Sequence, residues 1–122
     1  MSNLQNLRNN EKLFAQIRWN DPNEQIKDFR LSRDGGYTYE FGREPFELFL
    51  SWIGGRVMVR SHECPPEGYE LFFNNRLVTI FSNGGRSGES YYEGRVKPTF
   101  MEASLTERIS KIEPTKHIVA LK

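Results

Sequence analysis

The chain has 122 residues, which is enough for one small domain. Hydrophobic residues make up 37% of it and aromatic residues 13%, so it can build a core and is not a disordered tail. The chain has seventeen basic and sixteen acidic residues. The resulting net charge of +1 gives no electrostatic basis for binding nucleic acid or an anionic membrane.

The cysteine content and the distribution of apolar residues narrow the class of protein further. Cys64 is a single thiol and cannot form an internal disulfide, and no cluster of cysteine and histidine has the spacing of a zinc site. No apolar run approaches the roughly 20 residues of a membrane span. Residues 1–6 lack the pattern of a signal peptide. We therefore expect a soluble, cytoplasmic protein that forms a single domain over residues 1–122.

Two helices are predicted in the first half of the chain. Apolar residues recur near one helical face over residues 3–19, and Asn20-Asp21-Pro22 ends this helix because proline restricts the residue before it. Residues 25–42 have no clear period and predict an ordered surface loop, with a short extended segment over residues 37–41. The second helix runs from Pro45 to Ile53, since apolar residues follow Pro45 at helical spacing and two glycines come next.

The sequence of the second half of the chain predicts mainly strands. β-branched residues predict a strand over residues 56–60, and residues 69–73 and 76–81 flank a two-residue hairpin connector, Asn74-Asn75. Residues 96–103 and 108–112 predict a further strand pair. Residues 117–121 form either an edge strand or a loose tail. The whole pattern predicts an α/β (α+β) fold with two helices and mostly mixed or antiparallel strands.

Three side chains are candidates for chemistry. His62 follows a predicted strand, and imidazole is a common metal ligand, although a lone histidine there is more often a surface or hydrogen-bonded residue. Arg33 offers a planar fork of donors that matches phosphate oxygens, although a solvated loop cation is the commoner case. Asp21 is either a turn aspartate before proline or a residue of a site. These three residues are chemically ambiguous on their own.

Four other residues are given no part in the chemistry. Tyr69 and Phe81 are predicted core residues of the hairpin, and Cys64 and His117 are interpreted as structurally incidental.

The surroundings of the three candidates resemble a known family. The relevant segments are Arg60-Ser61-His62-Glu63, Glu67-Gly68-Tyr69-Glu70-Leu71-Phe72-Phe73 and Arg76-Leu77-Val78-Thr79-Ile80-Phe81-Ser82. Their order is similar to the C-terminal signature of the phosphoprotein phosphatases, the two-metal serine/threonine phosphatase family that includes calcineurin. Upstream, the similar segments are Trp19-Asn20-Asp21-Pro22 and Ser32-Arg33-Asp34-Gly35-Gly36-Tyr37-Thr38.

The resemblance carries expectations for fold and site. It covers about residues 18–112, leaves residues 113–122 as a tail, and implies the C-terminal portion of a metallophosphoesterase β-sandwich flanked by helices. It implies that His62 is a metal ligand, that Arg33 contacts the substrate phosphate, and that Asp21 is a catalytic residue near the site. The implied cofactors are two divalent metal ions, manganese, iron or zinc.

The chain also departs from the family pattern. Asp34 stands in place of the small glycine after Arg33, and two extra residues follow Thr38. Arg86 and Ser87 occupy the positions of a tyrosine and a cysteine of the family's active-site loop. These differences indicate a divergent member.

Most of the family's metal ligands have no counterpart here. The family supplies them from Gly-Asp-x-His-Gly, Gly-Asp-x-x-Asp-Arg-Gly, Gly-Asn-His-Glu and His-Gly-Gly segments, and none of these occurs in the sequence. A single imidazole cannot hold a two-metal centre. Because the family's upstream strands have no counterpart either, we expect an uncovered strand edge near residues 57–59.

Two functions therefore remain open. The first is the C-terminal part of a metal-dependent protein serine/threonine phosphatase, acting on phosphoserine and phosphothreonine proteins together with a separate N-terminal half. The alternative is a non-catalytic remnant that binds a phosphopeptide or a partner. A nucleic-acid binder is the least favoured class because the charge is balanced, and no membrane partner is expected.

Overall fold

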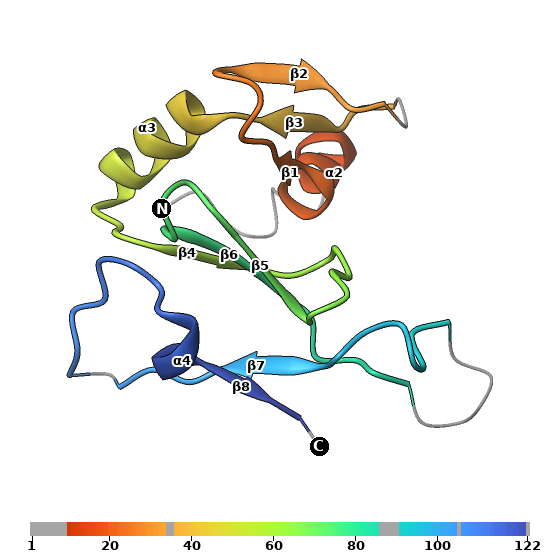
Figure 1. Cartoon of the computed structure of the whole chain (residues 1–122). Coiled ribbons are helices and arrows are strands. Elements are labelled where there is room, and N and C mark those ends of the chain that lie inside the picture. The colour runs from red at the N-terminus through yellow and green to blue at the C-terminus, as the bar shows by residue number, and fades with distance from the viewer. Residues whose placement is uncertain (1–9, 34–35, 86–90, 105, 122) are drawn as a thin grey trace. The chain divides into compact units, whose positions relative to one another are not determined.

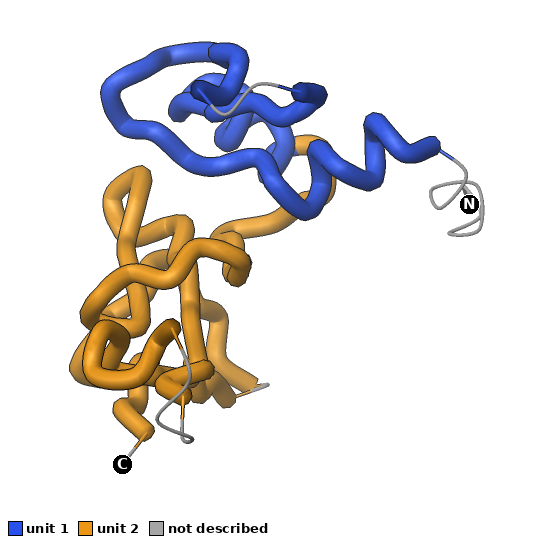
Figure 2. The backbone as a smooth tube through the Cα atoms, turned by 90° about the vertical axis from the view of Figure 1, so that its right-hand side faces the viewer, with its two compact units in different colours: residues 1–51 blue, residues 52–122 orange. Residues whose placement is uncertain are grey.

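The computed structural model describes residues 10–33, 36–85, 91–104 and 106–121. The chain divides into two compact units, residues 1–51 and 52–122 (Figure 2), and each is described by itself. Within the described residues, three helices and eight strands form small mixed and antiparallel sheets, which confirms the predicted α+β class. The single domain over residues 1–122 stays a prediction. No helix of the described residues is long and apolar enough to cross a membrane.

Some expectations lie outside the described residues. These are the first part of the helix predicted over residues 3–19, and the departures at Asp34, Arg86 and Ser87.

Unit 1 contains a three-stranded sheet. Helix α2 (Glu11–Trp19) is followed by β1 (Asp21–Pro22), β2 (Phe29–Leu31) and β3 (Tyr39–Phe41) (Figure 1). The strand order is β1-β3-β2, with β1 parallel and β2 antiparallel to β3. The prediction of a surface loop over residues 25–42 is therefore wrong for β2, whose three side chains are all exposed and give no burial pattern in the sequence.

A polar network fixes the register of this sheet. Arg30 on β2 lies opposite Glu40 on the central strand β3. The Glu40 carboxylate accepts hydrogen bonds from Arg30 Nε at 2.8 Å and from Asn23 Nδ2 at 3.0 Å. The hydrogen bond from Arg30 is the main reason why the pKa of Glu40 lies below its usual range, and the bond from Asn23 acts in the same direction.

Helix α3 (Arg43–Ile53) confirms the predicted helix and begins two residues earlier. Phe46 and Leu50 are its buried residues, one turn apart. Just before the helix, Gly42 lies against the backbone of an earlier segment. A Cβ atom at this position would lie 2.2 Å from the Ile26 carbonyl oxygen. Only glycine therefore fits at this crossing.

Unit 2 is built around the strand β6 (Leu77–Ile80). It lies between β4 (Met58–Arg60), which is parallel to it, and β5 (Tyr69–Phe72), which is antiparallel. Three consecutive β6 side chains are buried: Leu77, Val78 and Thr79. The three predicted strands are thus confirmed to within two residues at each end. Among the described strands, β4 lies at an edge of this sheet, and its Val59 side chain is 52% exposed.

The connection between β5 and β6 is longer than predicted. It comprises residues 73–76, with positive φ angles at Phe73, Asn74 and Asn75 of 53°, 58° and 62°. Asparagine tolerates this region better than most residues, which explains the two asparagines. The neighbouring aromatic residues Tyr69 and Phe81 are half-buried.

The predicted pairing of residues 96–103 with 108–112 is wrong. Strand β7 (Thr99–Met101) pairs antiparallel with β8 (Ile118–Ala120), so the tail provides the edge strand. Residues 108–112 form no strand; Ile112 is fully buried there and donates its N–H to the Asn75 carbonyl at 2.7 Å. A short unpredicted helix, α4 (Pro114–His117), precedes β8, and its His117 is buried rather than incidental.

Gly68 joins the sheet of β5 to the segment before β7. Its φ angle is +77°, and a Cβ atom there would lie 1.9 Å from the Lys97 carbonyl oxygen. Its own carbonyl accepts bonds from Phe81 N at 2.8 Å and Thr99 Oγ1 at 2.6 Å. A side chain at position 68 would break this junction.

We expect Gly68→Ala to destabilise unit 2 much more than Gly94→Ala. Gly94 also has a positive φ, of 67°, but open space surrounds its missing Cβ. Gly94→Ala should cost about 1–2 kcal/mol from backbone conformation alone, and Gly68→Ala about 1–3 kcal/mol more from overlap. Urea denaturation followed by circular dichroism measures both. Equal losses would contradict the close contact with Lys97.

Acidification should weaken unit 1 through Glu40. Because its folded-state pKa is lowered from 4.5, the ionised carboxylate stabilises the fold above that pH, and this stabilisation disappears as the pH falls through the lowered value. Trp19 fluorescence in a Trp52→Phe background reports the unfolding of unit 1. Glu40→Gln and Arg30→Gln should both reduce the loss of unfolding free energy as the pH falls. Lys12→Gln removes a cation that does not act on Glu40 and should leave this loss unchanged. A decline of unchanged steepness in Glu40→Gln would assign it to other groups.

Candidate functional site

The candidate metal ligand His62 lies just beyond the carboxyl end of β4. The parallel register pairs Arg60 with Thr79, so the ends of β4 and β6 meet at the same edge of the sheet. Arg60 Nη1 donates a hydrogen bond to the buried Thr79 Oγ1 at 3.2 Å. His62 and the residues that follow β6 are therefore held at one end of the sheet of unit 2.

The backbone of His62 is strained. Its φ angle is +100°, a conformation that L-residues other than glycine rarely adopt. Such a residue costs on the order of 1–3 kcal/mol, and residues of this kind cluster at active sites and ligand sites. The rest of unit 2 must hold His62 in this conformation.

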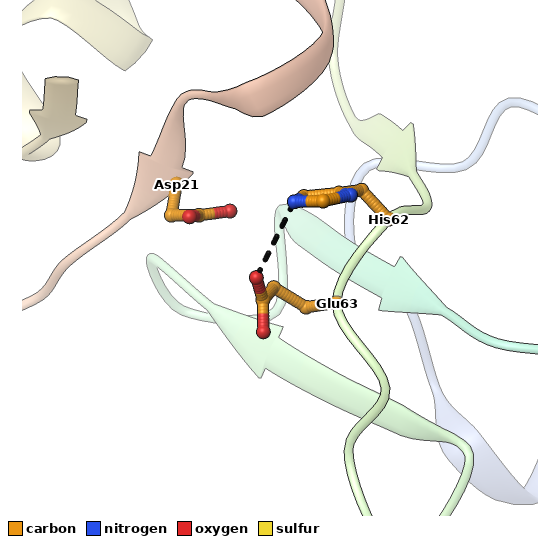
Figure 3. A group of neighbouring side chains, drawn as sticks. All are labelled: Asp21, His62 and Glu63. Carbon is orange, nitrogen blue, oxygen red and sulfur yellow. Dashed lines mark ion pairs between the residues drawn. The ribbon is translucent and has the colours of Figure 1, made fainter. Parts of the chain in front are cut away.

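The side chain of His62 remains accessible and lies beside a carboxylate. It is 29% exposed, and its Nε2 lies 3.6 Å from Glu63 Oε1 (Figure 3). Imidazole nitrogen together with carboxylate oxygen is a donor set that suits zinc, iron and manganese. Glu63 was not predicted as a site residue, although its position directly after the histidine was an available signal.

Ring contacts and hydrogen bonds hold the loop that follows β6, at the same end of the sheet as His62. The Phe81 ring packs edge-on against Tyr92, with ring centroids 4.8 Å apart. Ser82 Oγ donates to the Thr99 carbonyl at 2.6 Å, and Asn83 Oδ1 accepts from Gly85 N at 3.0 Å. These contacts fix the start of the segment that the resemblance assigns to an active-site loop.

Arg33 and Asp21 belong to unit 1. Arg33 is exposed on the turn between β2 and β3, where Ser32 N donates to the Thr38 carbonyl at 3.0 Å. Asp21 is half-buried in β1, opposite Glu40, so the interpretation as a turn residue is wrong. The functional roles of Arg33 and Asp21 stay predictions.

The strain at His62 predicts the order of stability of two variants. His62→Gly should be more stable than His62→Ala by about 1 kcal/mol, because glycine adopts a φ of +100° without steric cost. As a control, Ser61→Gly should be less stable than Ser61→Ala, since residue 61 has no positive φ. Chemical denaturation of the four variants provides the comparison. A more stable alanine variant at position 62 would mean that the backbone is unstrained there.

Most of the chain is similar to known proteins. No family model matches the chain. It is 32% identical to human serine/threonine-protein phosphatase with EF-hands 1 over 102 residues, 82% of this chain and 15% of the relative. Mouse serine/threonine-protein phosphatase with EF-hands 2 is 37% identical over 82 residues, 67% of this chain and 10% of the relative. The putative serine/threonine-protein phosphatase C27B7.6 of Caenorhabditis elegans is 28% identical over 104 residues, which are 85% of this chain and 22% of the relative.

The chain thus spans less than a quarter of each of these three relatives. All three carry the name serine/threonine-protein phosphatase, and the matches cover two thirds or more of this chain. Over that part, the chain is homologous to serine/threonine-protein phosphatases, which supports its membership of the phosphoprotein phosphatase family.

Proposed function

We propose that the chain is the C-terminal part of the catalytic domain of a metal-dependent protein serine/threonine phosphatase. The observation that carries this proposal is His62, a histidine held with a φ of +100° at the carboxyl end of β4. It stands in the Arg-x-His segment of a chain whose relatives are named serine/threonine-protein phosphatases. The resemblance implies a metal ligand at the position of His62. A role in metal binding would account for the backbone strain at this polar residue.

The residues present fit part of a metal centre. His62 offers an imidazole nitrogen and Glu63 a carboxylate oxygen, both typical ligands of manganese, iron and zinc. Two divalent ions of this kind supply an activated water and neutralise charge on the phosphate when bound. One histidine and one carboxylate cannot complete the coordination of two ions, so we propose that another polypeptide segment donates the remaining ligands.

Arg33 and Asp21 complete the proposal. The exposed guanidinium of Arg33 keeps its charge at any working pH and can donate two parallel hydrogen bonds to the phosphate of phosphoserine or phosphothreonine. Asp21, within Trp19-Asn20-Asp21-Pro22, is proposed as a catalytic carboxylate near the reacting group. The proposed substrates are therefore phosphorylated proteins.

A chimera tests this function. The segment of human serine/threonine-protein phosphatase with EF-hands 1 that matches this chain is replaced by the chain, and hydrolysis of a phosphoserine peptide is measured with manganese. We expect hydrolysis above that of the relative with the segment deleted. His62→Ala should lower kcat by roughly 100-fold, because losing this proposed ligand weakens the binding of an ion that neutralises charge on the phosphate. Arg33→Ala should raise KM and lower kcat.

The matched control for Arg33 is Lys97→Ala, which removes an exposed cation paired with Glu67. It should leave both kinetic constants unchanged. A chimera with a native circular dichroism spectrum that fails to hydrolyse the peptide with manganese, iron or zinc would contradict the proposal. Phosphopeptide binding by the chain itself, dependent on Arg33 and unaffected by EDTA, would instead favour the non-catalytic remnant.

A further inference from the structure

Strand β2 of unit 1 has backbone groups that point away from its sheet. It lies at the edge, since the strand order is β1-β3-β2 (Figure 1). The Asp28 carbonyl accepts a hydrogen bond at 2.9 Å from the residue after β3, and Ser32 N donates one at 3.0 Å to the residue before β3. Because such bonds alternate along an antiparallel pair, residues 28, 30 and 32 face β3. The N–H and C=O groups of Phe29 and Leu31 therefore point outward.

This edge is open and apolar. In the part of the chain that the structure describes, no hydrogen bond reaches the outward groups of Phe29 and Leu31. Their side chains are 56% and 54% exposed, and they share one face because alternate residues of a strand do so. The charged residue of β2, Arg30, is held by Glu40 on the neighbouring strand. Edge strands usually carry unpaired charges or proline that keep further strands away, and β2 has neither.

The residue proposed to bind phosphate lies at the end of this edge. Arg33 follows Leu31 by two residues and is exposed on the turn after β2. Ser32, between them, still bonds to the segment of β3, so the strand is held up to Arg33. Outward backbone groups, two exposed apolar side chains and a guanidinium thus follow one another along β2. An extended peptide that carries a phosphate has matching groups in the same order.

We propose that the phosphorylated protein binds as an added strand along the edge of β2, with its phosphate at Arg33. The inference rests on the proposed function, which assigns the phosphate to Arg33. Antiparallel pairing is the more stable arrangement. It places the second and fourth residues after the phosphoserine opposite Leu31 and Phe29. The outward N–H and C=O groups of both residues then gain partners, and apolar side chains at those two substrate positions pack on the exposed side chains of β2.

A second copy of the chain fits this edge less well than a phosphopeptide. A two-fold pair of β2 strands that uses both outward residues pairs Phe29 of each copy with Leu31 of the other, and its centre is Arg30. The two Arg30 side chains would lie directly opposite each other, and like charges in that position destabilise a strand pair. A phosphopeptide instead brings a negative charge to the exposed cation at Arg33. Charge complementarity therefore favours the phosphopeptide.

Amide hydrogen exchange of the full chain, followed by NMR with zinc present, tests the proposal. The probe is a short phosphoserine peptide with valine at the second and fourth residues after the phosphoserine. At a free concentration of ten times its Kd, it should slow exchange of the Phe29 and Leu31 amides about tenfold. The Arg30 amide already faces β3 and should change little. N-methylation of both valines should weaken binding about tenfold or more, whereas N-methylation of the residue between them, whose N–H points away from β2, should not.

Matched variants separate the edge from general apolar binding. Leu31→Gln should weaken peptide binding about fivefold through the loss of an apolar contact. Ile17→Gln, at an exposed apolar residue of α2 in the same unit, should leave binding unchanged.

Three results would overturn the added strand. The first is an absence of peptide binding. The second is binding that depends on Arg33 but leaves the exchange of the Phe29 and Leu31 amides unaltered, which would keep the phosphate contact alone. The third is protection of these amides without peptide that rises with chain concentration, which would assign the edge to a second copy. A chimera that fails to hydrolyse the phosphopeptide, together with protected amides in the full chain, would reject the phosphatase function and support the strand addition.

Discussion

The parallel pairing of β4 with the central strand β6 is the constraint on which the candidate site depends. β6 buries Leu77, Val78 and Thr79 in consecutive positions, so its register cannot slip without removing apolar side chains from the core. The buried hydroxyl of Thr79 then binds Arg60, the last residue of β4. The core thus fixes Arg60, and His62 follows it by two residues.

His62 and Gly68 lie in the same short segment, and both have positive φ angles. At position 68, glycine satisfies both a positive φ and a contact that excludes any Cβ atom. At position 62, the backbone is equally unusual, yet an imidazole is retained. Packing alone would favour glycine there. The strain costs stability, and the proposed role of His62 as a metal ligand would account for it, because such trade-offs are typical of functional sites.

The parts predicted from sequence are those with local signals. Helical spacing located α3, β-branched residues located β4, and the strand-forming segments on either side of Asn74-Asn75 located β5 and β6. Strand β2 was missed because all its side chains are exposed. The pairing of β7 with β8 was missed because the intervening segment contains isoleucines that serve packing, not a strand. At the site, a motif pointed to His62, but only coordinates reveal its strained φ angle.

The long connection between β7 and β8 has a consequence for changes in chain length. Strands this far apart in the sequence stay paired through their own ladder, from Thr99–Ala120 to Met101–Ile118. Shortening the connection would thus erase the cavity that residues 107–113 line together with His117, while sparing the sheet and the edge that carries His62. A change in the length of this connection is therefore compatible with an unchanged sheet at the end that carries His62.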